Sequence, residues 1–328
     1  SNRLLYGSPF ALYEKYPDDR SKNYRNIFLD ENNCEVIFSE IYDGKSGKGH
    51  SWDMWQNPSG YNAWAGGQQN CVYLEFVESY ENIDGSDPTI DREKVAQYYT
   101  WTLDELWGKK DPRFKASIYT QGTPWTHEGA SVTLDYHVGI FVDGQWINDG
   151  FYEGVPALGV CANNWRPTPF GILKYLDESS AMIPERYYSK TDWIVFRLGE
   201  IYLNFAEAAF ELNKPDSALW AVNKIRARAG MPELQSITRE QIRHERKIEL
   251  AYEGHLYWDM RRWKLADKEY NGYRVHGLKI TPHQGAFKFE YVDCDLQDRK
   301  FLAKTYVFPI PYDELANNSA IEQYDEWK

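Results

Sequence analysis

Three glutamates in the stretch HERKIELAYEGHLYWDMRRW, residues 244–263, have the spacing most suggestive of chemistry in this sequence. Glu245, Glu249 and Glu253 recur at every fourth position, which places their carboxylates on one stripe of a helix. Carboxylates, together with the two histidines of the same stretch, are groups that bind metal ions or transfer protons. The stretch is therefore either a catalytic or metal-binding helix or a charged part of the scaffold.

The spacing fits neither zinc binding nor acid–base catalysis. A zinc helix needs His-Glu-x-x-His, but the residue four positions after His244 is Ile248. Acid–base catalysis needs two carboxylates that face each other across a cleft, not two stacked along one helix edge. We therefore interpret the stretch as scaffold, a semi-buried network of ion pairs, and predict no catalytic residue, metal site or cofactor. Basic partners stand in the same stretch: Arg246, Lys247, Arg261 and Arg262.

A second stretch, SWDMWQNPSGYNAWAGGQQN at residues 51–70, has the composition of a sugar-binding site. It contains no Val, Ile or Leu, and its aromatic rings alternate with amides and one carboxylate. Sugars pack their C–H faces on flat aromatic rings, and their hydroxyls pair with planar polar groups. The alternative is that these rings fill the core beneath a long loop. The candidate ligand-binding residues are Trp52, Asp53, Trp55, Asn57, Tyr61, Asn62, Trp64 and Gln68.

Two weaker signals favour structural roles. Trp125, Trp146, Tyr152 and Trp165 are spread over long loops, where we interpret them mainly as core residues. NIDGSDPTID, residues 82–91, is acidic enough to hold a cation weakly, but its Asn, Gly, Asp and Pro residues are typical of a turn that needs no ion.

The second half of the chain predicts the helices that position these residues. Apolar residues at 194, 198, 201, 205, 208 and 212 mark one face of a helix, and those at 218, 222, 225 and 229 mark the next. Pro215 is well placed to begin the second helix, and Gly230 ends it. Thr238 and Gln241 form a capping box that starts a third helix running to about Leu265, after which the chain is expected to be irregular.

The first half is rich in Gly, Pro, Asn, Asp and aromatic residues, with only short periodic pieces. We predict a strand in 34–42, a helix over 91–106, and a turn followed by a strand in 109–120. The predicted fold is mainly α with long irregular regions and a few short strands. Residues 1–185 form a loop-rich ligand-binding subdomain, and residues 186–328 form a helical repeat-like scaffold with an irregular C-terminal segment, both within one domain.

Charge and hydropathy argue against a nucleic-acid partner and against a membrane-spanning helix. The formal net charge of −12, without a basic tract, argues against nucleic acid as a partner because the phosphate backbone would be repelled. No apolar run approaches the roughly 18 residues that a membrane-spanning helix needs. The four cysteines are far apart and form no Cys-x-x-Cys pair.

Several motifs resemble known families. Leu198-Gly199-Glu200-Ile201-Tyr202 resembles the core of a tetratricopeptide repeat. ITREQIRHERKIELAYEGHLYWDMRRW resembles the signature helix of the SusD/RagB-like family, the surface nutrient-binding lipoproteins of Bacteroidetes-type bacteria. FRLGEIYLNFAEAAFELN with ALWAVNKIRARAGMP resembles that family's last helical repeat pair, and VFPIPYDELANNSAIEQY its C-terminal segment. The resemblance covers essentially the whole chain.

The resemblance implies a SusD-like fold, in which a tetratricopeptide-like helix pair packs on a loop-rich subdomain. It also implies a non-catalytic protein of polysaccharide utilisation, which captures oligosaccharides or polysaccharides for import through a SusC-like TonB-dependent outer-membrane transporter. Such proteins are surface-exposed and lipid-anchored through an N-terminal segment, here expected upstream of the sequence. A peptide-binding member of the same family and a glycoside hydrolase are the alternatives.

Overall fold

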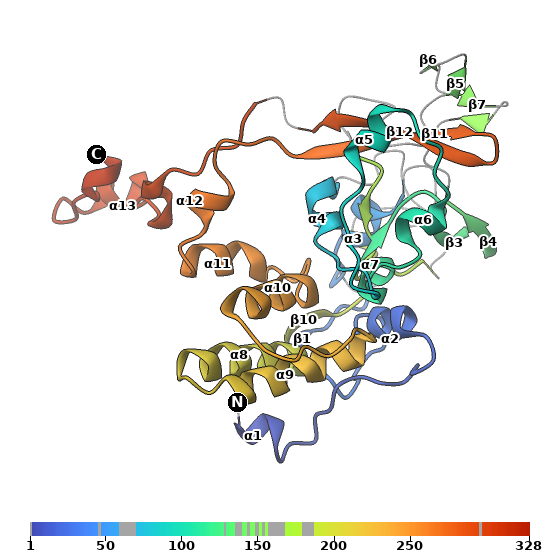
Figure 1. Ribbon diagram of the computed structural model, residues 1–328. Helices are drawn as coiled ribbons and strands as arrows, with labels where there is room; N and C mark the ends of the chain where they lie inside the picture. The colour runs from blue at the N-terminus through green and yellow to red at the C-terminus, as the bar shows by residue number, and fades with distance from the viewer. Residues whose placement is uncertain are drawn as a thin grey trace.

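The computed structural model describes residues 2–44, 47–58, 70–127, 129–134, 168–178, 187–294 and 297–328, and the backbone of four short strands between residues 140 and 156. Helices predominate, and the described strands pair two by two in small antiparallel sheets (Figure 1). The predicted fold class, mainly α with long irregular regions and a few short strands, is confirmed.

An antiparallel helix pair, α8 (Leu198–Glu211) and α9 (Pro215–Ala229), forms the lower layer of the view in Figure 1. Pro215 occupies the first turn of α9, and Gly230 ends it in the left-handed conformation with φ of 79°. Both boundaries were predicted from the sequence. Small side chains at the contact let the two backbones approach closely: Ala206, Ala209, Ala218 and Ala221 are all buried.

The start of α8 differs from the prediction, which placed Ile194 on the helix. Residues Trp193–Arg197 form strand β10, and the helix begins only at Leu198. β10 pairs with β1, Val36–Glu40, in the region predicted to be a strand, with Ser39 opposite Ile194. The β-branched and aromatic residues of 193–196 suit this pairing, and the apolar spacing alone did not distinguish it from helix.

The predicted third helix begins as expected but is interrupted. The capping box of Thr238 and Gln241 is present, and α10 spans Arg239–Glu249. The chain then turns through two left-handed residues, Tyr252 with φ of 63° and Gly254 with φ of 84°, before α11. The prediction of one helix to about Leu265 is therefore wrong. Of its remainder, α11 (His255–Arg262) is helical, and the short helix α12 (Ala266–Glu269) follows beyond the predicted end.

The predicted helix over 91–106 is also two short helices, α5 (Arg92–Ala96) and α6 (Leu103–Trp107). Tyr98 between them has φ of 55°, and the backbone of Trp101 pairs with that of Phe287 through two hydrogen bonds of 2.7 and 2.9 Å. This distant pairing holds the segment extended where its local pattern favoured helix.

Residues 109–120 contain a helix that the sequence analysis missed. Asp111 caps α7 (Pro112–Ser117) by accepting from the backbone N–H of Arg113, and proline occupies the first turn. The predicted strand is confirmed only at β2 (Ile118–Tyr119), which pairs with β9 (Gly171–Ile172).

A long hairpin lies in the part predicted to be irregular. β11 (His276–His283) and β12 (Ala286–Asp293) pair along their full length. Gln284 and Gly285 both have positive φ, 51° and 79°, as a two-residue hairpin turn requires. The hairpin packs on α5 and on α4 (Leu74–Glu78), so it lies with the elements of the first half (Figure 1). The predicted division at residue 185 stays a prediction.

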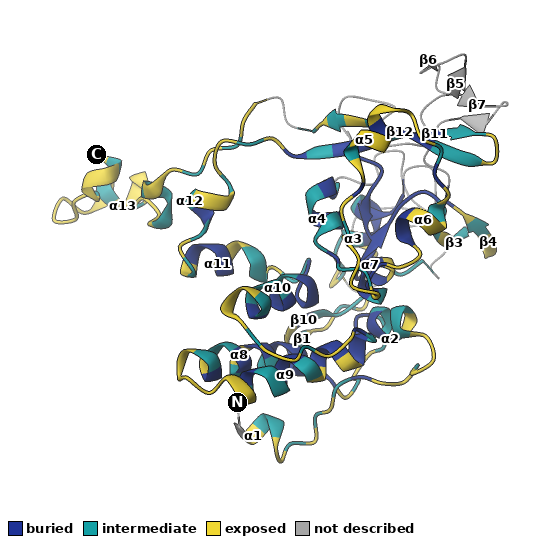
Figure 2. Ribbon diagram, in the orientation of Figure 1, coloured by how far each residue is buried: buried dark blue, intermediate teal, exposed yellow. Residues whose placement is uncertain are grey.

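The main core lies between this hairpin, α4, α6, α7 and the turn after α10. Its fully buried residues include Tyr80, Phe114, Phe170, Leu278 and Phe289. Figure 2 shows the buried faces of α7 to α10 meeting inside the molecule, while the C-terminal segment around α13 (Tyr312–Asn317) is exposed. The remaining described elements are α1 (Asn2–Leu5), α2 (Arg20–Asn26), β3 (Pro124–His127), β4 (Ala130–Thr133), β5 (Ile140–Val142), β6 (Gln145–Ile147), β7 (Phe151–Tyr152), β8 (Val155–Pro156) and two 3-10 turns at Ala303–Tyr306 and Asp325–Trp327.

Candidate functional site

A hollow lies beside the short helix α3, Trp52–Gln56. Its volume is about 580 Å³, within the usual size range of small-ligand sites. We call it the aromatic hollow because indole, phenol and imidazole rings form most of its wall, together with amide and hydroxyl groups. Its described lining residues are Tyr42, His50, Ser51, Trp52, Trp55, Gln56, Asn70 and Trp193.

His50 fixes the start of α3. Its Nδ1 accepts a hydrogen bond of 3.1 Å from the backbone N–H of Trp52, and its Nε2 lies 2.9 Å from the carbonyl oxygen of Thr191. Because Nδ1 accepts, the ring proton is on Nε2, which donates to Thr191. The indole N–H of Trp52 in turn donates to the carbonyl of Lys174 at 3.1 Å. These bonds hold the Trp52 ring in one orientation.

Asp53 and Asn57, two of the candidate residues, are 1% exposed. The backbone N–H of Asp53 donates to Ser189 Oγ, and its Oδ1 accepts from the backbone N–H of Asp177, each at 3.0 Å. Burial raises the pKa of the Asp53 carboxyl to about 6. Asp53 thus ties α3 to the segments around residues 177 and 189, and it does not line the hollow.

The structure brings together only part of the predicted site. Trp52 and Trp55 line the aromatic hollow, and both are partly exposed. Trp52 also packs against three core clusters, so its ring serves both the core and the hollow. The other four candidates lie outside the described residues: Tyr61, Asn62, Trp64 and Gln68.

Sequence reasoning missed three rings of the hollow, Tyr42, His50 and Trp193. Tyr42 and His50 pack edge to face with centroids 4.8 Å apart, and Trp193 stacks on Tyr175 at 4.7 Å. Tyr42 follows β1 and Trp193 begins β10, so the pairing of these strands brings the rings together. A correct prediction of that pairing was needed to find Tyr42 and Trp193, and His50 is held by a separate bridge to Ser189.

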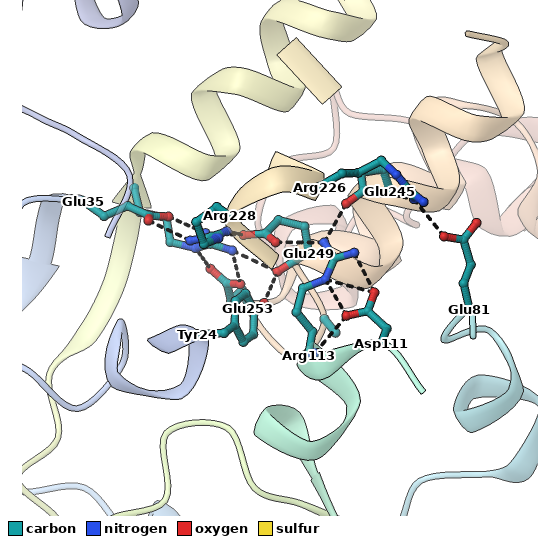
Figure 3. Close-up of polar contacts among 12 residues, drawn as sticks. Tyr24, Glu35, Glu81, Asp111, Arg113, Arg226, Arg228, Glu245, Glu249 and Glu253 are labelled. Atoms are coloured by element: carbon teal, nitrogen blue, oxygen red, sulfur yellow. Dashed lines mark hydrogen bonds and ion pairs between the residues drawn. The ribbon is translucent and has the colours of Figure 1, made fainter. Parts of the chain in front are cut away.

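The three glutamates of the opening stretch lie in a buried ion-pair network (Figure 3). The carboxylate of Glu249 contacts Arg113 at 3.0 Å, Arg197 at 2.7 Å, and Arg228. Glu249 is completely buried, which is deeper than the semi-buried position we predicted. The scaffold interpretation therefore has a physical basis, because each carboxylate oxygen is already paired with a cation.

The predicted partners of these glutamates are wrong. Arg246 pairs with Asp259 at 2.7 Å, and Arg262 pairs with Asp259 and Glu207. Arg261 donates to the carbonyl of Tyr306. The actual partners come from other elements: Arg113, Lys174, Arg197, Arg226 and Arg228.

The weaker sequence signals have structural roles where they are described. Trp125 is 2% exposed and packs in a core cluster, while the side chains of Trp146, Tyr152 and Trp165 lie outside the described residues. Residues 82–91 form a turn in which Asn82 donates to Ser86 and to the carbonyl of Asp87. Among the described residues, no group of three or more His, Cys, Asp or Glu side chains could hold a metal ion.

The fold and the site together define a class of protein, a helical scaffold that carries an aromatic hollow beside the two-stranded β1–β10 sheet. Within that class, this chain belongs to the SusD family, whose model matches residues 34–327. The resemblance inferred from the sequence motifs is confirmed. None of the described helices is long and apolar enough to cross a membrane.

Individual relatives agree with this assignment. The chain is 42% identical over 88 residues to the SusD-like protein P25 of Formosa agariphila, a match that covers 24% of this chain and 17% of that protein. A SusD-like protein of Bacteroides fragilis has 26% sequence identity and a TM-score of 0.72, over 95% of this chain and 58% of that one. A SusD-like carbohydrate binding protein of the same species has 23% identity and a TM-score of 0.70, over 98% and 60%. The chain thus spans less than two thirds of each relative.

Proposed function

We propose that this protein binds glycans without transforming them, and that the aromatic hollow is its sugar-binding site. The observation that carries the proposal is the wall of the hollow, where Trp52, Trp55, Tyr42 and Trp193 surround about 580 Å³. Indole and phenol rings offer stiff apolar faces with polar edges, which suit the C–H faces and hydroxyls of sugars. Amide groups of Gln56 and Asn70 extend the polar part of the same wall.

Family membership supports the same proposal. One of the structural relatives is described as a carbohydrate binding protein, and it shares the fold over 98% of this chain. As members of this family are expected to do, the protein would capture oligosaccharides at the cell surface. It would then pass them to a SusC-like TonB-dependent outer-membrane transporter.

The composition of the hollow favours binding over hydrolysis. Glycoside hydrolases of the common type use two carboxyl groups, about 5–9.5 Å apart, on either side of the scissile bond. No carboxylate is among the described residues that line the hollow. The glutamates at 245, 249 and 253 are engaged with arginines and lysine in the interior. An extended acidic cleft would favour the peptide-binding alternative, and no acidic residue is among the described residues that line the hollow.

The test is calorimetric titration of the protein with a panel of neutral oligosaccharides, beside two tryptophan variants. Trp55→Ala removes a ring of the hollow and should cost about 1 kcal/mol or more of binding free energy. Trp258→Ala removes a ring that is 57% exposed on α11 and is the matched control. Equal binding by both variants would overturn the site assignment. Release of reducing sugar during the titration would contradict the non-catalytic role, and binding of peptides alone would contradict the glycan.

A further inference from the structure

We infer that the ligand of the aromatic hollow is uncharged, a neutral oligosaccharide rather than one that carries uronic acids or sulfate groups. The inference rests on the proposed function and names the chemical class of the glycan. Its basis is the distribution of charge around the hollow.

No charged side chain is found among the described residues that line the hollow, although charged residues make up 26% of the chain. The sequence around and after α3 agrees with this observation. Every position from Met54 to Leu74 is free of Asp, Glu, Lys and Arg, and this range includes the whole segment 59–69 that follows α3. That segment therefore contains no ionic side chain.

His50 is the one ionisable base among the described residues of the wall, and its hydrogen bonds keep it neutral. The imidazole can accept from the backbone N–H of Trp52 only while Nδ1 carries no proton. Burial also lowers the pKa of His50 below its ordinary value of 6.5. The ring therefore supplies no positive charge at neutral pH.

The acidic groups near the wall would repel an anion. Asp192 Oδ1 accepts from the backbone N–H of Tyr42 at 3.2 Å, which places a carboxylate next to the backbone of one lining residue. Asp53 lies within α3 between the lining residues Trp52 and Trp55. Lys190, the cation whose charge acts on Asp53, lines a larger cavity of the molecule and is not among the described lining residues of the hollow. The cation of Lys174, whose carbonyl accepts from Trp52, is committed to Glu253 at 2.6 Å in the interior.

A second cavity in the same molecule has the opposite character. Its volume is about 890 Å³, and its wall carries many ions of both signs, including Lys22, Arg25, Lys115, Lys190 and Glu178. The larger cavity thus does not share the uncharged character of the described wall of the aromatic hollow.

An anionic sugar placed in the hollow would lose hydration without gaining a cationic partner. Moving a charge away from water is unfavourable unless an opposite charge or several hydrogen-bond donors replace the water. We therefore expect a carboxylated ligand to bind at least about tenfold more weakly than its neutral counterpart.

The experiment compares matched pairs of oligosaccharides that differ only at C6, the neutral hexose form and its C6-oxidised uronic acid form. Calorimetric titration of the protein should give the neutral member an affinity at least about tenfold higher than that of the acidic member. The affinity of the neutral member should be the same at low and at high salt. Equal or tighter binding of the acidic member, lost in Trp55→Ala, would overturn the inference and leave the proposed function standing. Failure of both members to bind, across the panel of glycans, would count against the proposed function itself.

A charge variant separates electrostatic rejection from steric rejection. Asn70 is an exposed lining residue, so Asn70→Lys should place a cation at the edge of the hollow. We expect this variant to raise the affinity for the uronic acid form at least several-fold, whereas Asn317→Lys, which adds the same charge at the exposed end of α13 and outside the hollow, should leave it unchanged. An acidic ligand that is rejected equally by both variants would show that shape excludes it, which would overturn the inference.

Discussion

Arg197, the last residue of β10, forms a two-point ion pair with Glu253, with Nε 2.6 Å from Oε2 and Nη2 2.8 Å from Oε1. The Nη1 atom of the same guanidinium lies 2.7 Å from both Glu35 and Glu249. One side chain thus joins the β1–β10 sheet to α10 and to the turn that follows it. Because β10 begins with Trp193, the network also supports the strand that contributes to the aromatic hollow.

The first prediction concerns Glu249, the centre of this network. Glu249→Gln leaves three buried guanidinium groups short of negative charge and should destabilise the protein by about 3–5 kcal/mol. Urea denaturation measures the change. Glu211→Gln is the control, because its pair with Arg239 is about half exposed and should contribute less than about 1 kcal/mol. Similar losses in both variants would show that the buried network contributes no more than a surface pair.

The second prediction is the loss of stability in acid. Burial alone would raise the pKa of the Glu249 carboxyl, but Arg228, Arg197 and Arg113 outweigh it and hold the pKa well below the ordinary value of 4.5. The pKa of Glu253 is also lowered. A carboxyl with a lowered folded-state pKa stabilises the fold above its unfolded pKa, and this contribution is lost as the pH falls below about 4.5.

Urea denaturation between pH 7 and pH 3 measures this loss. The parent protein should lose stability steeply below about pH 4.5, whereas Glu249→Gln should start lower and fall less steeply. Parallel curves for the two proteins would mean that other carboxyl groups cause the acid sensitivity.

The sequence predicted the role of the three glutamates but not their partners. A spacing of four residues identifies a stripe on a helix, and the absence of His-Glu-x-x-His argues against a zinc-dependent catalytic site. The arginines at 113, 197 and 228 come from α7, β10 and α9, and only the tertiary fold brings them to α10. Basic residues within the stretch were nearer in sequence, but they point to other acids, such as Asp259 and Glu207.

Long-range pairing also explains the errors in the predicted elements. Trp101 sits in a stretch with helical composition, yet it is paired with Phe287, which lies in the hairpin. The hairpin turn at Gln284 and Gly285 lacks the usual Asn-Gly or Asp-Gly signal, so the strands on either side were not recognised. Elements with strong local signals, such as α9 between Pro215 and Gly230, were predicted closely.

The third prediction tests why glycine stands at position 199. A Cβ added to Gly199 would meet Arg197 Nη1 and would lie 2.9 Å from Glu35 Oε1 and 3.2 Å from Glu249 Oε1. Gly199→Ala should therefore destabilise the protein by at least about 1 kcal/mol, although alanine favours helix over glycine by a similar amount. Thermal or urea denaturation measures the change. Gly7→Ala, which has open space around its Cβ, should have little effect, and a stabilised Gly199→Ala variant would contradict the close packing.

The last prediction links His50 to ligand binding at acidic pH. Once the imidazole is protonated, Nδ1 can no longer accept from Trp52, so α3 loses the bond that orients its first ring. One hydrogen bond is worth about 1 kcal/mol, so affinity for a neutral glycan should fall by up to about fivefold as the pH drops below 6.5, the ordinary pKa from which burial lowers that of His50. Calorimetric titration at several pH values measures the profile.

The effect of protonating Asp53 must be separated from that of protonating His50 in this experiment. Asp53 has a raised pKa of about 6, so its carboxyl also gains a proton as the pH falls from 7 to 5. His50→Gln keeps a side-chain acceptor and cannot be protonated, so its affinity should be independent of pH between 7 and 5. Asp53→Asn keeps His50 and should retain the acid-induced loss. A pH dependence that survives in His50→Gln and vanishes in Asp53→Asn would assign the effect to the buried carboxyl and refute the role of the imidazole.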